Sequence, residues 1–386
     1  MVRPYKIVIA PDSFKGSLSA QDVAKAIQNG VDQAFPNATT VLLPLADGGE
    51  GTIDVLETVC KGQRIFCDVV DPLFDPIKAE YLLCDDGCAI IEMAKASGLT
   101  LVQPDKHDPS LTTTYGCGQL IKDALDHGAT KLIITLGGSA TNDGGCGALN
   151  ALGVCFYDIH GQTIVPVGGN LDQIKVIDDS SFDPRLRSVP TILLADVTNP
   201  LCGPNGASCV YGPQKGADHL MIQRLDHNLD HLSKVVESKY GINFRDVSGS
   251  GAAGGLAFGL MSFCGATIQN GIDTILDLVH FDQVINDADL VITGEGKMDG
   301  SSLNNKVAIG VAKAAKRVNN SLTVIAICGC YDHHVTALNE KGIDAIFSIS
   351  TGSISQEESV TNASYFLTNQ AKQIARLIKS FYMAVK

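Results

Sequence analysis

Five short apolar runs in this chain each lead directly into a polar, glycine-rich loop. Near-continuous apolar runs of this kind are typical of buried parallel strands. In a parallel α/β sheet, ligand sites lie at the carboxyl ends of the strands, so we expect these loops to line one active-site cleft. The pairs of run and loop are KIVIA with PDSFKGS, TVLLPLA with DGGEG, KLIITL with GGSATNDGG, TILLA with DVTNPLCG, and DLVIT with GEGKMDG.

Both ends of the chain alternate strands with helices, which predicts a parallel sheet. Near the N-terminus, Ser19 is the expected N-cap of a helix, and Asp22 follows it three residues later at the spacing of a capping box. The expected strands here are 6–10 and 40–45, with a second helix over 49–60. Towards the C-terminus we expect strands at 288–293, 322–328 and 345–349, and helices around 306–317, 334–341 and 362–383.

The middle of the chain has a different pattern. RIFCDVV, KAEYLL and CAIIEMA follow one another with only short turns, which predicts antiparallel strands, and mixed elements follow, with a helix near 214–239. A chain of 386 residues also exceeds one ordinary core. We therefore predict a discontinuous Rossmann-like α/β domain over 1–65 and 286–386. A mixed α/β domain over 66–285 is inserted into it, with the active site in the cleft between the two.

Charge and cysteine usage limit the class of partner. The formal net charge of −13 argues against nucleic acid or an anionic membrane, because both require a basic surface. The twelve cysteines are scattered, often in apolar runs, which favours buried thiols in a reducing compartment. The uncharged stretch 248–272 contains seven glycines and reads as a glycine loop followed by a buried helix. The N-terminus shows no signal-peptide pattern, so we expect a cytoplasmic protein; its oligomeric state is not predicted.

The residue types of the five loops suit phosphoryl transfer. That reaction needs backbone N–H groups and cations around the phosphates, carboxylates for Mg²⁺, and a base beside the attacking hydroxyl. Glycine amides together with Lys15 and Lys215 supply the first group. Each carboxylate taken alone also fits a helix cap or a turn. The candidate carboxylates are Asp12, Asp47, Glu50, Asp143, Asp196, Glu295 and Asp299.

Other motifs are weaker or absent. The chain has no GxxxxGK[ST], no HRD, no DFG and no GxSxG, which argues against P-loop enzymes, protein kinases and α/β-hydrolases. GSGAAG (249–254) matches GxGxxG, but the preceding FRDVS is a poor strand, so an NAD-dependent dehydrogenase stays an alternative. His227 and His231 share a helix face without a neighbouring glutamate, and Cys84 and Cys88 lack a second pair, so neither predicts a metal site.

Taken together, the loops resemble a known family. KIVIAPDSFKGSLSA, PLADGGEGT, MAKASGL, GGSATNDGG, DVTNPLCGPNGA, GPQKGA, GAAGGL and DLVITGEGKMD resemble, in order and spacing, the motifs of the bacterial glycerate kinases that form 2-phosphoglycerate. The resemblance implies ATP- and Mg²⁺-dependent transfer of the γ-phosphoryl group to the 2-hydroxyl of D-glycerate. It also implies two α/β domains, one of them discontinuous.

The resemblance places the site residues by position, and we infer their roles. Asp196 is the expected base, with Asp47 second, and Lys15 is expected to be catalytic. Lys15 and Lys215 would clamp the glycerate carboxylate or the transferring phosphoryl group, and Glu295 and Asp299 would hold Mg²⁺. Further substrate contacts are expected at Ser13 and Asn199. Phosphate or nucleotide contacts are expected at Gly48, Gly49, Glu50, Ser139, Thr141, Asn142 and Lys306.

The chain departs from the family pattern after GEGKMD. The family continues with S-Q-[ST]-x-x-G-K-x-P, whereas this chain has Gly300, Ser301, Asn305 and Ala308 at the positions of Ser, Gln, Gly and Pro. Lys297 stands where the family often has Arg, which binds phosphate in a different geometry. A kinase of a related hydroxy acid and a catalytically silent ligand-binding paralogue therefore remain alternatives.

Overall fold

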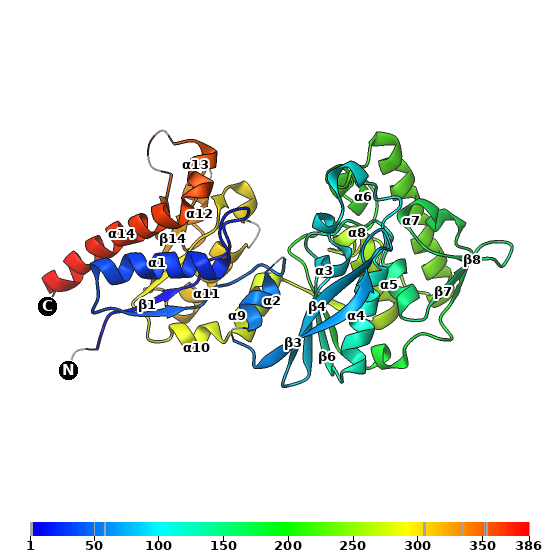
Figure 1. Ribbon diagram of the computed structural model, residues 1–386, viewed down its shortest axis with the longest axis horizontal. Coiled ribbons are helices and arrows are strands. Elements are labelled where there is room, and N and C mark those ends of the chain that lie inside the picture. Colours follow the sequence, from blue (N-terminus) through cyan, green and yellow to red (C-terminus); the bar gives the residue numbers. More distant parts are fainter. Residues whose placement is uncertain are drawn as a thin grey trace. The chain divides into compact units, whose positions relative to one another are not determined.

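The computed structural model describes residues 3–49, 51–57, 59–303, 306–333, 335–350, 352 and 354–385 (Figure 1). The chain divides into two compact units. The first comprises Met1–Asp47, Asp54–Val59 and Gly271–Lys386, and the second comprises Gly48–Ile53 and Cys60–Asn270. Within the described part of the chain, none of the helices combines the length and the apolar character needed to cross a membrane.

The first unit is built on a five-stranded sheet in the order β16-β14-β12-β1-β2, with every neighbouring pair parallel. This is the doubly wound order 2-1-3-4-5, with the reversal between β1 and β12. The α/β class and the strands expected at both chain ends are confirmed. The strands are β1 (Lys6–Ile9), β2 (Thr39–Leu42), β12 (Leu290–Thr293), β14 (Thr323–Cys328) and β16 (Ala345–Ser348).

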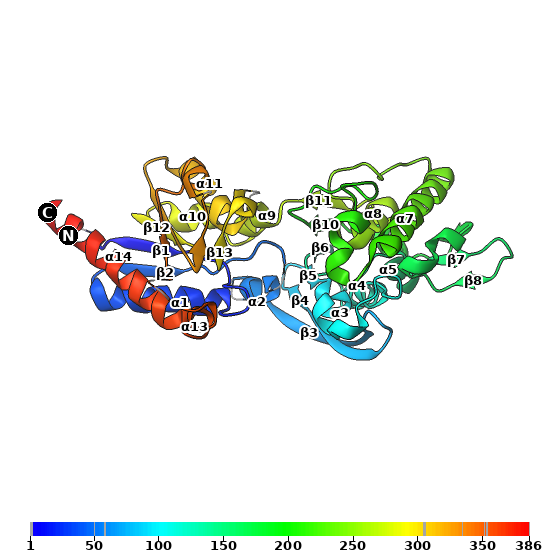
Figure 2. The same cartoon turned by 90° about the horizontal axis from the view of Figure 1, so that it is seen from above.

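Helices cover both faces of this sheet (Figure 2). On one face, α1 (Ala20–Ala34) and α14 (Ala363–Val385) pack together over a core that includes Ile7 and Ile9. Helix α11 (Val307–Val318) packs against β12 and β14 with its buried apolar residues. Ser19 caps α1 as expected, because its side chain accepts a hydrogen bond from the backbone N–H of Asp22.

The remaining elements of the first unit are short. Residues 271–285, which we expected in the inserted domain, belong to this unit, and Ile272 packs closely against Gly310 of α11. The elements are α2 (Thr52–Glu57), which crosses the division between the units, α9 (Gly271–Leu278), α10 (Phe281–Ile285), β13 (Lys297–Met298), η6 (Gly300–Leu303), β15 (Cys330–Tyr331), α12 (Val335–Asn339) and α13 (Gln356–Thr361).

The second unit contains a six-stranded mixed sheet in the order β11-β10-β6-β5-β4-β3. The predicted meander is present, because β3 pairs with β4 and β4 with β5 in antiparallel fashion, whereas β5, β6, β10 and β11 are parallel. The strands are β3 (Gly62–Val70), β4 (Pro76–Cys84), β5 (Cys88–Glu92), β6 (Lys131–Thr135), β10 (Thr191–Leu194) and β11 (Thr267–Gln269).

Helices and a small second sheet complete this unit. The uncharged stretch forms the buried helix α8, as expected. The helices are α3 (Ala94–Ser97), η1 (Leu99–Leu101), η2 (Pro104–Lys106), α4 (Tyr115–Asp126), α5 (Cys146–Ala151), η3 (Gly168–Gln173), η4 (Pro184–Arg187), α6 (Ala207–Tyr211), η5 (Pro213–Lys215), α7 (His219–Tyr240) and α8 (Ala252–Cys264). The second sheet has the order β8-β7-β9, with β7 (Cys155–Tyr157), β8 (Thr163–Ile164) and β9 (Val176–Asp178).

Candidate active site

In the first unit, the loops after β1 and β12 meet at the point where the strand order reverses. The backbone N–H of Asp12 donates to the carbonyl oxygen of Gly294 over 2.8 Å, and the Thr293 hydroxyl donates to the carbonyl of Ala10 over 2.8 Å. Gly294 also lets β14 pass close by, because a Cβ atom there would lie 1.9 Å from the carbonyl oxygen of Ile327. A topological switch point is where open α/β sheets bind their ligands.

Three of the predicted carboxylates gather at this point. Asp12 and Glu295 are each only 6 % exposed. Burial, together with the carboxylates of Asp47 and Glu295, raises the pKa of Asp12 to about 7. Burial also raises the pKa of Glu295, against the opposing effects of Ser302 and Lys306. Buried carboxylates that repel one another form a place where a bound cation is stabilised.

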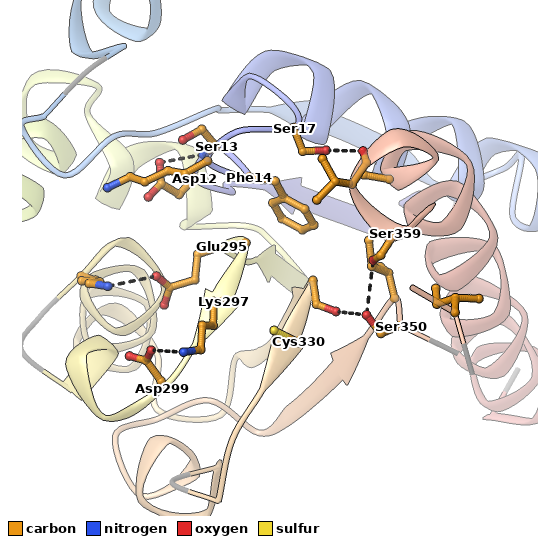
Figure 3. A pocket seen from close by; sticks show the side chains of 18 of the residues that line it. Asp12, Ser13, Phe14, Ser17, Glu295, Lys297, Asp299, Cys330, Ser350 and Ser359 are labelled. Atoms are coloured by element: carbon orange, nitrogen blue, oxygen red, sulfur yellow. Dashed lines mark hydrogen bonds and ion pairs between the residues drawn. The ribbon is translucent and has the colours of Figure 1, made fainter. Parts of the chain in front are cut away.

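Lysines surround these carboxylates at longer range. Lys15 Nζ lies 3.9 Å from Asp47 Oδ2, and Lys306 Nζ lies 3.9 Å from Glu295 Oε2. Lys297 pairs with Asp299, with 3.2 Å between Nζ and Oδ2 (Figure 3). The predicted Ser13 also lies here, and its backbone N–H donates to Asp12 Oδ1 over 2.7 Å. The structure thus brings together the predicted site residues of the first and fifth loops. From the second loop, it adds Asp47 to this group.

The donor set fits Mg²⁺ bound partly by phosphate. Over the described residues, no group of three or more histidine, cysteine, aspartate or glutamate side chains is arranged to hold a metal ion by itself. Mg²⁺ in nucleotide enzymes, however, usually takes one or two carboxylates, waters and substrate phosphates. Glu295 Oε1 is buried and has no hydrogen-bond partner among the described residues, so it has a lone pair to offer.

A cavity of about 720 Å³ opens from this cluster within the first unit. Its charged end contains Asp12, Lys15 and Glu295, and its other end is lined by Phe14, Ser350, Ser359 and residues near the start of α14. Figure 3 shows the Phe14 ring between the charged side chains and the serines. Apart from Phe14, the residues of the second end follow β16 in a stretch that none of the loop motifs contains, so the sequence did not indicate it.

The second unit contains a different cluster, centred on Lys215. This side chain is 2 % exposed, and its Nζ donates to Ser139 Oγ over 2.9 Å and to the carbonyl oxygen of Thr141 over 2.7 Å. Burial lowers the pKa of Lys215 to about 7, although nearby Asp143 opposes the shift. The buried lysine therefore fixes the GGSATNDGG loop through two hydrogen bonds. Of the two residues that it contacts, Ser139 is the more exposed, at 8 %.

Two buried hydroxyls belong to the same neighbourhood. Thr141 Oγ1 and Ser97 Oγ have no hydrogen-bond partner among the described residues, although both side chains are completely buried. The backbone N–H of Ala140 donates to the carbonyl of Ser97, which places Ser97 beside the loop. Ser97 was not predicted as a site residue; its membership of the MAKASGL motif was the available signal.

Two other residues of this loop are structural. Asp143 is fully buried and accepts hydrogen bonds from the backbone N–H groups of Thr114, Gly145 and Gly147. Asn142 Nδ2 donates to Ser208 Oγ over 3.0 Å in the interior. The side chain predicted to contact phosphate at position 142 is thus engaged within the protein, and contacts from this part of the loop would come from its backbone.

Asp196 lies in the loop after β10, separated from the end of the strand by Ala195. Its Oδ1 accepts a 3.0 Å hydrogen bond from Asn270 Nδ2, which orients the carboxylate. Asn199 is held by two contacts, because its Nδ2 donates to the carbonyl of Asn205 and its Oδ1 accepts from the Tyr211 hydroxyl. Strands β6 and β10 are parallel neighbours, so the loops bearing Ser139 and Asp196 start at the same sheet edge.

The start of α2, just after the DGGEG segment, is held by a residue that the sequence did not indicate. Glu92, at the end of β5, is 1 % exposed and accepts a 2.7 Å hydrogen bond from the backbone N–H of Ile53. Gly49 packs against Gly137, where a Cβ atom would lie 3.0 Å from the Gly49 Cα. Gly48 adopts a φ of +86°, which favours glycine. The predicted Glu50 lies outside the described residues.

The segment that departs from the family pattern is partly described. Residues Gly300–Leu303 form a 3₁₀ turn in which the backbone N–H of Asp299 donates to Ser302 Oγ over 3.2 Å. Ala308 is fully buried on α11. Asn305 and the side chain of Ser301 lie outside the description.

The remaining motifs do not form sites. Residues 244–248, before GSGAAG, are not a strand, and 253–255 form a left-handed turn at the start of α8, so the dinucleotide-binding arrangement is absent from this described segment. His231 Nε2 lies 2.8 Å from the carbonyl oxygen of Ile174. All twelve cysteines are free, and Cys328 is buried as expected, whereas Cys330 is exposed.

Comparison with known proteins agrees with the family resemblance of the loop motifs. The profile of the Glycerate kinase family matches residues 7–379. The Glycerate kinase of Bacillus subtilis (strain 168) is 48 % identical over 97 % of this chain and 98 % of its own length. The Glycerate 2-kinase of Escherichia coli (strain K12) is 44 % identical over 96 % of this chain and 97 % of its own.

A solved structure agrees over the same length. A crystal structure from Salmonella typhimurium LT2, described as a glycerate kinase 2, matches with a TM-score of 0.87 and 43 % identity, covering 98 % of this chain and all of the other. Sequence and fold thus agree across both units. The chain belongs to the glycerate kinase family.

Proposed function

We propose that this protein transfers the γ-phosphoryl group of ATP to the 2-hydroxyl of D-glycerate, giving 2-phospho-D-glycerate and ADP. The observation that supports it most is the cluster of buried Asp12 and Glu295 with Asp47, Lys15 and Lys306 at a topological switch point. Carboxylates for Mg²⁺ beside cations for phosphate are what phosphoryl transfer requires. The named relatives include a Glycerate 2-kinase, which favours the 2-phosphorylated product.

We assign the triphosphate to the first unit. Lys15 and Lys306 would contact phosphate oxygens, and Glu295 and Asp299 would hold Mg²⁺ directly or through water. When bound, Mg²⁺ supplies positive charge that stabilises the transferring phosphoryl group. The Asp12 carboxylate, which repels Asp47 and Glu295 in the free protein, is stabilised in its charged form when cationic groups enter.

We assign the hydroxy acid to the second unit. The hydroxyls of Ser139 and Thr141, with the ammonium of Lys215 behind them, would bind its carboxylate or the phosphoryl group that it receives. Asp196 is the proposed base. The oxygen of the 2-hydroxyl attacks the γ-phosphorus, the bond to the β-phosphate oxygen breaks, and the hydroxyl proton passes to the Asp196 carboxylate, with ADP as the leaving group.

The direct test is ADP formation by the purified full-length chain with ATP and Mg²⁺. D-glycerate, L-glycerate and D-lactate are compared as acceptors. ADP formation that depends on D-glycerate supports the proposal. If ADP forms only with another hydroxy acid, the substrate is wrong, and if it forms with none, the kinase itself is.

The cytoplasm is the proposed compartment, because the twelve cysteines are all free thiols, which is typical of a reducing environment. The proposed partners are the two small substrates only, and the net charge of −13 argues against nucleic acid.

A further inference from the structure

The cavity of the first unit is much larger than the hydroxy acid needs. Its volume is about 720 Å³, which lies within the range of about 300–1,000 Å³ found for cofactor and drug-sized ligands. Glycerate is a three-carbon acid and would fill a small part of it. The carboxylates and lysines line one end only. A triphosphate and its metal would occupy that end, and the remaining volume would be left for another part of the ligand.

The far end of the cavity has a distinct chemistry. It is lined by Phe14, Ile349, Ile354 and Val360, with the hydroxyls of Ser350 and Ser359 among them. No charged side chain belongs to this end among the described lining residues. Apolar surface with a few hydroxyl groups suits a planar heterocycle and a sugar, and it disfavours a second anionic group.

The walls of this end are fixed by hydrogen bonds that connect distant parts of the chain. The Ser17 hydroxyl donates to the carbonyl oxygen of Val360 over 2.7 Å, which ties the loop after β1 to α13. The Ser350 hydroxyl donates to the carbonyl of Gly329 over 2.8 Å and lies 3.4 Å from Ser359 Oγ. Phe14 is 3 % exposed, so its ring is held in place between the two ends. Figure 3 shows this order, from charged groups through Phe14 to the serines.

We propose that the uncharged end of this cavity binds the nucleoside of the phosphoryl donor, so that the base lies beside Ile354, Ser359 and Val360 while the phosphates point towards Lys15 and Lys306. The inference rests on the proposed use of ATP. It defines the orientation of the donor, with the phosphates at the switch point and the nucleoside towards α13. It also assigns a binding role to residues that no loop motif contains.

The test separates the nucleoside from the phosphates. Val360 is 41 % exposed, so Val360→Trp fills the uncharged end without entering the core, and Val165→Trp at a 57 % exposed valine of the second unit is the matched control. Calorimetric binding of ADP and of inorganic tripolyphosphate is measured for the full-length wild type and both variants. We expect Val360→Trp to weaken ADP binding by about tenfold or more, equivalent to about 1.4 kcal/mol, and to leave tripolyphosphate binding unchanged.

Each other outcome is decisive. Unchanged ADP affinity in Val360→Trp and in Ser359→Phe, which fills the same end from the neighbouring position, overturns the assignment. Equal losses for ADP and tripolyphosphate also overturn it, because the variant would then act on the phosphate end or on folding. Failure of the wild type to phosphorylate D-glycerate, with ADP binding lost in Val360→Trp, would reject the proposed acceptor and leave the nucleoside site intact.

Discussion

Lys215 Nζ donates a 2.9 Å hydrogen bond to Ser139 Oγ from a position that is almost entirely buried. Burying an ammonium group costs free energy unless a negative charge compensates it. Burial accordingly lowers the pKa of Lys215 to about 7, so this group loses its proton near neutral pH. Protonated Lys215 therefore places a positive charge beside Ser139, and an anion bound close to Ser139 would stabilise this protonated form.

The pH dependence of stability tests this burial. In the unfolded chain Lys215 titrates near 10.5, whereas in the folded chain it titrates at about 7. Between these values unfolding takes up a proton, so the free energy of unfolding gains about 1.4 kcal/mol per pH unit as pH rises, and below about 7 this contribution is constant. Lys215→Met should lack that slope. Denaturant unfolding of both proteins from neutral to alkaline pH measures it, and parallel curves would contradict the buried lysine.

Glu92 is expected to position the DGGEG segment. In Glu92→Ala the backbone N–H of Ile53 loses this buried acceptor, which should cost about 1–3 kcal/mol of stability. Glu92→Gln keeps an acceptor and should lose less. If Glu92 positions the segment, KM for ATP rises in Glu92→Ala and recovers in Glu92→Gln. A loss of stability with an unchanged KM would reduce Glu92 to a purely structural role.

Asp196→Asn tests the proposed base. The asparagine can still accept the hydrogen bond from Asn270, so the loop should keep its geometry while the site loses its proton acceptor. We expect kcat to fall by about 10²–10⁴-fold with little change in KM. A near-normal kcat in Asp196→Asn would move the role of the base to Asp47.

Glu295→Gln tests the metal assignment. Removing its charge should raise the Mg²⁺ concentration for half-maximal activity by about tenfold, equivalent to about 1.4 kcal/mol. Asp282→Asn, which removes an exposed carboxylate paired with Arg317, is the control and should leave the Mg²⁺ dependence unchanged. The titration follows ADP formation against Mg²⁺ at fixed ATP. Identical titration curves for Glu295→Gln and wild type would contradict a role for Glu295 in holding the metal.

The fold was largely predictable, because the central strands of the first sheet are buried and appear as apolar runs such as KIVI and TVIAIC. The helix expected from residue 49 begins instead at Thr52, because Gly51 has a φ of +87°, which no α-helical residue adopts. The strand order could not be read from the runs, since it depends on which strands pair across the inserted unit. The assignment of 271–285 to the first unit could not be read from the sequence either, because it depends on packing such as that of Ile272 against Gly310 of α11.

The site was predictable where reactive side chains and glycines occur in the same loop, as in the loops with Asp12, Glu295 and Ser139. Glu92 and Ser97 were missed because a lone polar residue beside a strand has many structural explanations. The uncharged end of the cavity was missed because Ser359 and Val360 become neighbours of Phe14 only through tertiary packing. That the loops of both units serve one reaction stays a prediction.

The regiochemistry of the product tests the central claim most directly. Purified protein is incubated with D-glycerate, ATP and Mg²⁺, and enolase alone is added to convert any 2-phosphoglycerate into phosphoenolpyruvate, with 3-phosphoglycerate as the negative control. We expect phosphoenolpyruvate in proportion to ADP without a phosphoglycerate mutase. ADP formation that yields phosphoenolpyruvate only after mutase is added would show 3-phosphorylation, and it would contradict transfer to the 2-hydroxyl.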